Sequence, residues 1–376
     1  MQEIQLSPEE IARYSRHLLI EEFGMEGQLR LKQAKVLVVG AGGLGCPLLL
    51  YLAAAGVGTI GIIDFDTVEE SNLQRQILYT IDDIGKPKVD VAKKKLLAIN
   101  PYIHIITYQQ QLSAKNALEI FSSFDIVADG TDNFVTRYLV NDACVFSDIP
   151  NVYASILQFE GQVSVFNYKE GPNYRDIFPV PPAPNTIPNC AEAGVLGVLP
   201  GIIGSMQANE VIKVISGIGT PLSGRLFIFD ALHFSSKIFT ISKDKNNPLT
   251  GDNPTIKALT DVDLFCGATS SITNEISVQQ LKEMFDTKED IQLIDVREHY
   301  EYNQVNLGGI CIPLHQLKQS MDLISKEKKV IVHCKTGMRS AKAVQLLLDN
   351  GYRNVYNLNG GIIVYAKEID NQLPLY

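Results

Sequence analysis

Short apolar runs alternate with amphipathic segments through the first part of the chain. The runs have the length and residue types of buried strands and lie at 35 to 40, 59 to 64, 103 to 108 and 124 to 129. Apolar positions at helical spacing fill the segments at 44 to 55, 87 to 98, 114 to 121 and 134 to 146. This alternation predicts an α/β fold, in which helices cover both faces of a mostly parallel sheet.

The N-terminal segment and the region after residue 150 complete this first unit. Residues 1 to 33 predict two helices, the first of which has Ser7 as its N-cap. Further strands are expected at 151 to 168 and 225 to 230. The proline-rich stretch at 179 to 189 predicts a loop, and long loops in compact domains are usually functional.

A polar, turn-rich segment separates this pattern from a second one. Residues 242 to 255 predict the start of a linker that runs to about residue 274. The α/β pattern then returns, with strands at 291 to 296, 329 to 334 and 354 to 358 and a helix at 338 to 349. We therefore expect domains at 1 to 250 and 275 to 376, joined by a linker at 251 to 274.

Length and charge limit the class of protein. A chain of 376 residues exceeds one hydrophobic core of typical size, which favours two domains. No apolar run reaches the ~18 residues of a membrane span. The N-terminal sequence has neither the basic nor the apolar part of a signal peptide, so we expect a cytoplasmic protein with no membrane partner. The net charge of −9 argues against general nucleic-acid binding.

The segment VLVVGAGGLG at 36 to 45 predicts a nucleotide site. A buried strand leads into Gly40, Gly42 and Gly45, whose backbone N–H groups can approach phosphate oxygens at a helix N-terminus. Asp64 ends the next strand and can hold a ribose. This pattern alone is equally typical of an NAD-dependent oxidoreductase.

Polar residues downstream favour ATP over NAD. Asn72 and Arg75 follow the second strand, Lys88 opens a helix, and Asp132 and Asn133 follow the fourth strand. Side chains of these kinds suit the polyphosphate and metal of ATP better than a nicotinamide ring. Either cation alone could be an ordinary surface charge, and it is their combination that favours a phosphate site.

These motifs resemble those of the MoeB/ThiF family, whose members adenylate the C-terminal glycine of ubiquitin-like sulfur carriers. The matching segments are RYSRHL at 13 to 18, GAGGLG at 40 to 45, DFDTVEESNLQRQ at 64 to 76, GKPKVD at 85 to 90 and DGTDN at 129 to 133. The resemblance implies a Rossmann-like, ATP-binding adenylation domain. It implies nucleotide or phosphate contacts from Gly43, Asp64, Ser71, Asn72, Arg75 and Lys88. It also places Asp132 and Asn133 beside Mg²⁺, and implies a homodimer in which Arg16 reaches the site of the partner subunit.

The second unit resembles a rhodanese domain, a smaller α/β fold. The motifs that carry this resemblance are LIDVREHYEY at 293 to 302, HCKTGMRSA at 333 to 341 and LNGGI at 358 to 362. Cys334 begins a loop whose backbone N–H groups, together with Arg339 and Lys335, would favour a thiolate or persulfide anion. A phosphatase-like or inactive loop is the alternative, but the spacing from Cys334 to Arg339 suits sulfur better than the larger phosphate.

Three polar residues near this cysteine are interpreted as structural. Asp295 and Arg297 follow a strand, where such a pair usually fixes loops by hydrogen bonds. His333 adjoins Cys334 in a strand, so the two side chains should point to opposite faces. We therefore do not expect a Cys–His dyad.

The remaining cysteines carry two further predictions. Cys190 follows the proline-rich loop and resembles, in fused members of the family, a cysteine that accepts the activated carrier; a cysteine that merely caps a helix is the alternative. The chain has no Cys-x-x-Cys pair, whereas the family commonly has two that bind zinc. The corresponding positions are Asn173, Asp176, Asp263 and Cys266. We therefore expect no structural zinc, and packing must fix this region instead.

Together the two units predict one sequence of reactions. The first would adenylate the C-terminal glycine of a small ubiquitin-like sulfur carrier ending in Gly-Gly, using ATP and Mg²⁺. The second would supply sulfur from a rhodanese persulfide, loaded by an upstream donor such as a cysteine desulfurase, to give a thiocarboxylate. Molybdopterin biosynthesis is the expected pathway, with thiamine or tRNA thiolation as alternatives. An NAD-binding oxidoreductase or a non-catalytic scaffold is a less favoured interpretation.

Overall fold

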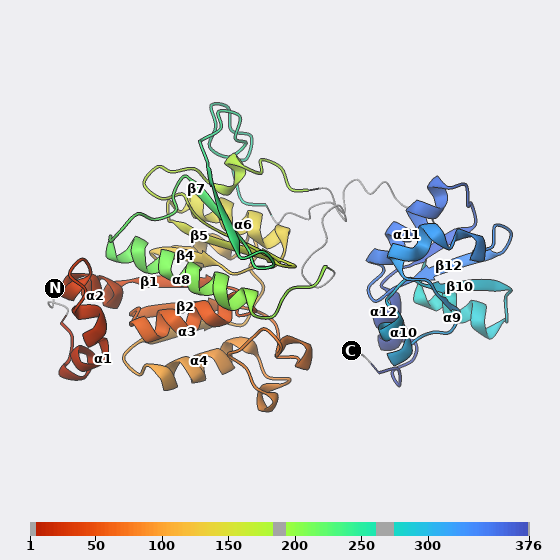
Figure 1. Cartoon of the computed structure of the whole chain (residues 1–376), viewed down its shortest axis with the longest axis horizontal. Coiled ribbons are helices and arrows are strands. Elements are labelled where there is room, and N and C mark those ends of the chain that lie inside the picture. Colours follow the sequence, from red (N-terminus) through yellow and green to blue (C-terminus); the bar gives the residue numbers. More distant parts are fainter. Residues whose placement is uncertain (1–4, 183–192, 261–273, 375–376) are drawn as a thin grey trace. The chain divides into compact units, whose positions relative to one another are not determined.

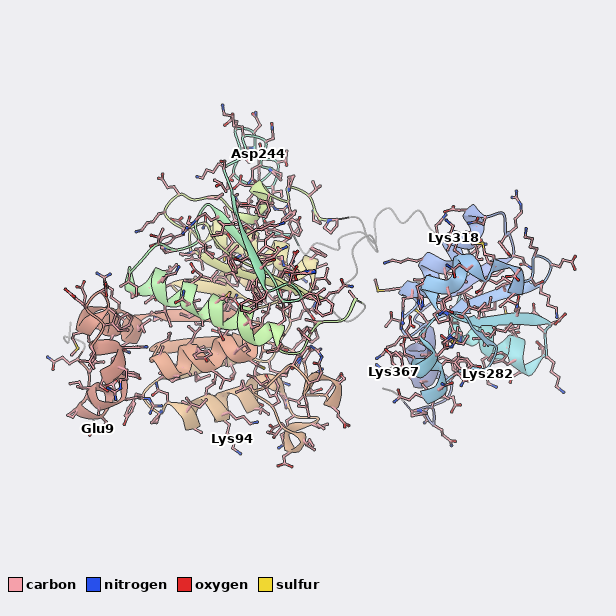
Figure 2. All side chains as sticks on the ribbon, in the orientation of Figure 1. Glu9, Lys94, Asp244, Lys282, Lys318 and Lys367 are labelled. Atoms are coloured by element: carbon pink, nitrogen blue, oxygen red, sulfur yellow. The ribbon has the colours of Figure 1, made fainter. Side chains whose placement is uncertain are left out.

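The chain forms two compact units, Met1–Leu264 and Phe265–Tyr376. The computed structural model describes residues 5 to 182, 193 to 260 and 274 to 374 (Figure 1). Charged side chains such as Glu9, Lys94, Lys282 and Lys318 project from the surface of their units (Figure 2). Among the described residues, no helix combines the length and the apolar character that crossing a membrane requires.

The first unit is built on an eight-stranded sheet. Its strands are β1 (Lys35–Val39), β2 (Thr59–Ile63), β3 (His104–Tyr108), β4 (Ile126–Asp129), β5 (Asn151–Leu157), β6 (Glu160–Phe166), β7 (Arg225–Asp230) and β8 (Ser235–Thr240). Their order in the sheet is β3-β2-β1-β4-β5-β6-β7-β8. Pairing is parallel from β3 to β5 and antiparallel from β5 to β8. The predicted α/β fold with a mostly parallel sheet is confirmed, and its parallel part runs from β3 to β5.

Helices cover both faces of this sheet (Figure 1). They are α1 (Pro8–Leu18), α2 (Gly24–Gln33), α3 (Gly45–Ala55), α4 (Lys88–Ile99), α5 (Ala117–Phe121), α6 (Phe134–Phe146) and α8 (Leu199–Ser216), with short 3-10 turns at Glu70–Asn72, Ile81–Asp83 and Tyr174–Asp176. Val36 and Val38 of β1 belong to the core shared with α3, α4 and α8. Leu37 and Val39 belong to the core shared with α5 and α6. The alternation of side chains along a strand thus supplies one apolar layer to each face.

The N-terminal helix begins where the sequence predicts it. Ser7 Oγ accepts a hydrogen bond from the Glu10 backbone N–H at 3.2 Å, and Glu10 Oε2 accepts one from the Ser7 N–H at 2.8 Å. Pro8 occupies the first helical position, where a missing N–H costs no hydrogen bond. This reciprocal capping satisfies backbone donors that would otherwise have no partner at the end of α1.

The structure differs from the sequence prediction at two places in the first unit. Strand β8 was not expected, because all six of its residues are exposed and its sequence therefore has no alternation to detect. Residues at the start of the predicted linker are packed rather than extended, since Asn247 and Leu249 are buried. Asn247 Nδ2 donates to Asp176 Oδ1 at 2.8 Å, so polar hydrogen bonds hold a segment that looks like a linker in sequence.

The second unit contains a five-stranded, wholly parallel sheet. Its strands are β9 (Glu275–Ile276), β10 (Ile291–Asp295), β11 (Ile310–Cys311), β12 (Lys329–His333) and β13 (Val355–Leu358), in the order β11-β10-β12-β13-β9. Its helices are α9 (Val278–Asp286), α10 (His299–Gln304), α11 (Met338–Asp349) and α12 (Gly361–Glu368), with 3-10 turns at Leu314–Gln319 and Met321–Leu323. The expected smaller α/β unit is confirmed. Strand β12 lies at its centre and ends directly before Cys334.

Candidate functional site

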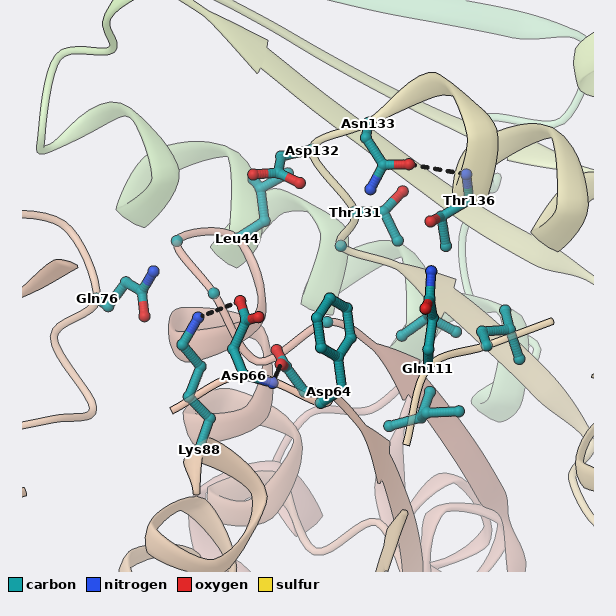
Figure 3. A pocket seen from close by; sticks show the side chains of 18 of the residues that line it. Leu44, Asp64, Asp66, Gln76, Lys88, Gln111, Thr131, Asp132, Asn133 and Thr136 are labelled. Atoms are coloured by element: carbon teal, nitrogen blue, oxygen red, sulfur yellow. Dashed lines mark hydrogen bonds and ion pairs between the residues drawn. The ribbon is translucent and has the colours of Figure 1, made fainter. Parts of the chain in front are cut away.

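The main pocket of the first unit lies at the carboxyl ends of β1 and β4. These neighbouring strands continue to opposite sides of the sheet, and such a switch point is where open α/β sheets bind ligands. The Gly40 N–H donates to Ile63 O at 2.9 Å, and the Gly130 N–H donates to Val39 O at 3.0 Å, so both strand ends are anchored. Of the predicted site residues, the pocket is lined by Gly40, Gly42, Gly43, Asp64, Arg75, Lys88, Asp132 and Asn133 (Figure 3).

Backbone geometry requires glycine in the turn that enters this pocket. Gly40 has φ +93°, in the region that favours glycine. A Cβ atom on Gly45 would lie 2.1 Å from Gly40 O, because α3 begins so close to the end of β1. Gly45 therefore shapes the turn without lining the pocket. Tyr79, which does not line the pocket, holds the same turn in place, because its Oη donates to Ala41 O at 2.8 Å.

Asp64 is held at the pocket by two backbone donors. Its Oδ2 accepts from the Ala41 N–H at 2.7 Å, and its Oδ1 accepts from the Asp66 N–H at 2.8 Å. Burial raises the pKa of Asp64 above its ordinary value, while the nearby charge of Lys88 acts in the opposite direction. The carboxylate is thus placed at the end of β2, where the sequence predicts a ribose contact.

The two predicted cations reach the pocket from different segments. Lys88 is buried at the start of α4, and its Nζ lies 2.9 Å from Asp66 Oδ2 (Figure 3). Arg75 is half-buried, and its Nη1 donates to Ser71 O at 3.0 Å. A buried lysine facing a pocket differs from an ordinary surface cation, which is the alternative that the sequence left open for Lys88.

Ser71 and Asn72 lie beside the pocket without lining it. Ser71 contributes its carbonyl oxygen to Arg75, as described above. Asn72 is buried, and its Oδ1 accepts from the Glu69 backbone N–H at 3.3 Å. Both residues therefore shape the segment that carries Arg75 into the pocket.

Asp132 and Asn133 line the pocket at the start of α6. Asn133 caps this helix, with its Oδ1 accepting from the Thr136 N–H at 2.9 Å. Asp132 is exposed and faces the pocket across from Lys88 and Asp66 (Figure 3). Within the described residues there is no cluster of three or more metal-ligating side chains. Magnesium is often bound by only one or two carboxylates plus substrate phosphates, so an exposed Asp132 fits that ion.

Several pocket residues were not predicted from sequence. They are Phe65, Asp66, Gln76, Gln110, Gln111, Leu112, Thr131, Thr136, Ile156 and Val195. Gln110 and Gln111 follow β3, and the rule that ligands meet the carboxyl ends of parallel strands could have indicated them. Thr131 supports the loop after β4, because its Oγ1 donates to Asp129 Oδ1 at 2.6 Å. Burial raises the pKa of this Asp129 carboxyl above its ordinary value.

Arg16 lies on α1, well before the glycine turn in the chain. Arg16 is exposed on α1 and does not line the pocket of its own chain. Cys190 falls outside the described residues, and the chain is described again from residue 193. Val195, shortly after that point, lines the pocket.

The cysteine loop of the second unit surrounds a buried sulfur. Cys334 Sγ accepts from the Gly337 backbone N–H at 3.2 Å and from Ser340 Oγ at 3.4 Å. The same Ser340 hydroxyl lies 3.0 Å from Gly337 O. The loop and the start of α11 thus place two hydrogen-bond donors against the sulfur.

Three glycines interlock beneath this loop. A Cβ atom on Gly361 would lie 2.5 Å from Cys334 O and 2.8 Å from the Gly337 nitrogen, and Gly337 itself packs against the Gly360 nitrogen. All three have positive φ. The Ile362 N–H donates to Cys334 O at 2.9 Å. The LNGGI motif therefore forms the floor of the cysteine loop.

The polar residues near the loop are arranged as the sequence predicts. Asp295 and Arg297 are fully buried, and Arg297 Nη2 donates both to Asp295 Oδ2 and to Val305 O at 2.6 Å. This pair ties strand β10 to the segment after α10, so its predicted structural role is confirmed. Burial lowers the pKa of His333 to about 4, and neither ring nitrogen has a hydrogen-bond partner among the described residues.

Hydrogen bonds connect Asn173 and Asp176, two of the positions that correspond to the family's zinc-binding cysteines, to the segment at 244 to 250. Asn173 Nδ2 donates to Thr250 Oγ1 at 2.8 Å. Asp176 Oδ1 accepts from the Asp244 N–H at 2.9 Å, and its Oδ2 accepts from the Asn173 N–H at 2.7 Å. Hydrogen bonds from two backbone N–H groups thus hold both oxygens of this carboxylate within the fold. Asp263 and Cys266, the other corresponding positions, lie outside the described residues.

Comparisons with known proteins match both units. The ThiF family model matches residues 14–250, and a rhodanese-like domain model matches residues 277–368. A probable adenylyltransferase/sulfurtransferase of Mycobacterium tuberculosis, MoeZ, is 44% identical over 99% of this chain and 96% of its own length. A sulfur carrier protein adenylyltransferase of Thermus thermophilus is 51% identical over 69% of this chain and 97% of its own length. The crystal structure of Escherichia coli MccB with MccA-N7isoASN has TM-score 0.58 at 24% identity over 66% of this chain and 76% of that chain, a likeness of fold.

Proposed function

This chain belongs to the ThiF family and has a C-terminal rhodanese-like domain, and we propose that it converts the C-terminal glycine of a ubiquitin-like sulfur carrier to a thiocarboxylate. As an adenylyltransferase and sulfurtransferase, it uses ATP in the first half-reaction. The carrier would end in Gly-Gly. The name of the Thermus relative, which acts on a sulfur carrier protein, supports this class of partner.

One observation supports the adenylation step: Lys88, Arg75 and the carboxylate of Asp132 line the same pocket at the carboxyl ends of β1 and β4. The carrier carboxylate would attack the α-phosphorus of ATP, and pyrophosphate would leave. Such a reaction needs alignment and neutralisation of phosphate charge rather than covalent help from the protein. Lys88 and Arg75 would neutralise the triphosphate, and Asp132 would hold Mg²⁺, which lowers the charge on the leaving pyrophosphate when bound.

The buried sulfur of the second unit supports the transfer step. Cys334 thiolate would take a sulfane sulfur from a donor and become a persulfide. The terminal sulfur of this persulfide would then attack the carrier's acyl-adenylate, and AMP would leave. Attack of Cys190 on the Cys334 sulfur would release the carrier thiocarboxylate and leave a Cys190–Cys334 disulfide, which two external thiols would reduce. In the other order, Cys190 would first accept the carrier from the acyl-adenylate as a thioester, and the Cys334 persulfide would then displace Cys190. An upstream cysteine desulfurase would be the donor.

Further parts of the proposal concern assembly and pathway. Arg16 would reach the pocket of a second subunit, which makes the enzyme a homodimer. We propose molybdopterin biosynthesis as the pathway, which the name MoeZ of the mycobacterial relative suggests, with thiamine and tRNA thiolation as the other pathways of this chemistry. We propose the cytoplasm as the location. An NAD-dependent oxidoreductase finds no support in the comparisons, which match adenylyltransferases over the nucleotide pocket.

The test is ATP–pyrophosphate exchange with a purified Gly-Gly carrier. Wild-type protein should exchange only when ATP, Mg²⁺ and carrier are all present, and NAD should not compete. Asp132→Ala should abolish exchange because Mg²⁺ loses its protein ligand. Asp252→Ala is the matched control, since this exposed carboxylate does not line the pocket. Normal exchange in the Asp132 variant would contradict the metal assignment, and no exchange in wild type would contradict the proposed function.

A further inference from the structure

The arginine of the cysteine loop is held by a carboxylate that sequence reasoning did not find. Arg339 Nη1 donates to Glu301 Oε2 at 2.6 Å, and Arg339 Nη2 donates to Glu301 Oε1 at 2.7 Å. This two-point geometry is the strongest that a guanidinium and a carboxylate can form. It fixes the orientation of Arg339 at the start of α11.

Glu301 is itself rigidly placed. It lies in α10, its side chain is only 6% exposed, and its Oε2 also accepts from the Glu298 backbone N–H at 3.0 Å. This second bond caps the start of α10. The carboxylate therefore belongs to the fold around the cysteine loop, and its negative charge lies against the positive charge of Arg339.

The Arg339–Glu301 pair changes which sulfur donors the loop attracts. Thiosulfate carries two negative charges, and its leaving group is sulfite, also a dianion. The persulfide group of a thiol carries one negative charge, and its leaving group is a thiolate. In either case Cys334 thiolate attacks the sulfane sulfur, the donor's S–S bond breaks, and Cys334 becomes a persulfide anion, so charge and electrons balance. An unneutralised arginine would favour the dianion more strongly than the monoanion.

We propose that Glu301 is a positioning and specificity residue, which holds Arg339 and cancels its charge so that the loop prefers a persulfide donor to thiosulfate. The inference rests on the proposed sulfurtransferase function. It assigns recognition of the sulfane sulfur to backbone N–H groups such as that of Gly337 rather than to the guanidinium. The preferred donor class is then a thiol-borne persulfide, either small or on a protein.

The test compares two donors on the full-length protein. Formation of the Cys334 persulfide is followed by mass spectrometry in single turnover, with thiosulfate and with cysteine persulfide, whose ammonium and carboxylate charges cancel. The ratio of the two second-order rate constants is the readout. Glu301→Gln should raise the ratio of thiosulfate to persulfide rates about tenfold, because the freed guanidinium attracts the dianion more. Glu301→Asp keeps the charge and should keep the ratio. Glu298→Gln, whose carboxylate faces His315, is the matched control.

A second variant keeps the test decisive if Glu301→Gln does not fold. The double change Glu301→Gln with Arg339→Gln removes a neutral pair, so it should keep the wild-type ratio even if both rates fall. A tenfold fall in the ratio would show that Arg339 attracts thiosulfate in the wild type and would overturn the proposal. An unchanged ratio in folded Glu301→Gln would also overturn it. Failure of both donors to load wild-type Cys334 would instead contradict the proposed function.

Discussion

The nucleotide pocket and the cysteine loop both place cations beside a reactive centre, but they hold them differently. In the pocket, Lys88 pairs with Asp66, whose side chain is 49% exposed, and Arg75 binds a backbone carbonyl. In the loop, Arg339 is held at two points by the nearly buried Glu301. A half-exposed partner is easily exchanged, whereas a two-point pair with a nearly buried carboxylate is harder to break.

This difference matches the charge that each site must accommodate. The triphosphate of ATP carries several negative charges, so the pocket needs cations that can change partner when the ligand enters. A sulfane sulfur is small and carries little charge, so the loop can use backbone N–H groups and a hydroxyl. Under the proposed function, an arginine would thus bind substrate in one unit and stabilise the loop in the other.

The largest effect is expected from replacing Cys334, which should stop sulfur transfer and leave the adenylation reaction intact. Cys334→Ser should abolish persulfide and carrier thiocarboxylate while leaving ATP–pyrophosphate exchange near normal, because a hydroxyl cannot carry a persulfide. Cys190→Ser should keep the persulfide and slow thiocarboxylate formation. Mass spectrometry of the carrier and the exchange assay measure the two halves. Cys311→Ser is the control in the same unit, and thiocarboxylate at the normal rate in Cys334→Ser without another sulfur donor enzyme would refute the two-step proposal.

The converse change should affect only the pocket. Lys88→Ala should lower pyrophosphate exchange on the order of 100-fold, because a buried cation aimed at transferring phosphates is lost. Persulfide formation on Cys334 should not change. Lys94→Ala, an exposed lysine of the same helix, is the matched control (Figure 2). Equal exchange in the two lysine variants would mean that Lys88 serves only to pair with Asp66.

A mixing experiment tests whether the pocket depends on a second copy of the chain. Arg16→Ala and Asp132→Ala proteins should each be inactive in exchange. Mixed in equal amounts and allowed to exchange subunits, they should recover about a quarter of wild-type activity, since half of the dimers then contain one intact site. Persulfide loading should be the same before and after mixing. No recovery despite demonstrated subunit exchange would assign Arg16 to its own chain.

The smallest expected effect concerns stability of the first unit. Asn247→Ala should lower its free energy of unfolding by about 1–3 kcal/mol, because the Asp176 carboxylate loses a buried donor. Added zinc should not restore the loss, and elemental analysis should find far less than one zinc per chain. Asn246→Ala, at an exposed neighbouring position, is the control. Stoichiometric, tightly held zinc would show that the hydrogen-bonded region has metal ligands after all.

Local patterns predicted those parts of the fold and site that depend on neighbouring residues. The strand before Gly40, the Ser7 cap and the position of Asp64 each follow from a short segment. Partners from distant segments could not be found in this way. Glu301 and Arg339 lie 38 positions apart, and nothing in either motif indicates that they pair.

Two further misses have separate physical causes. Asp66 is adjacent to predicted residues, yet its pairing with Lys88 depends on how residues 66 to 88 fold back. The segment at 244 to 250 is polar and turn-rich, as linkers are, but its amides and carboxylates satisfy one another within the fold. Composition alone does not distinguish polar groups that bind water from polar groups that bind each other.

The interlocked glycines under the cysteine loop also set an order of events during protein synthesis. The ribosome makes Cys334 before Gly360, Gly361 and Ile362, whose backbone atoms form the floor of the loop. On a growing chain, the sulfur therefore lacks its finished surroundings until the start of α12 has been translated. The surroundings of the cysteine are therefore completed only after the whole adenylation unit has been made and has had time to fold.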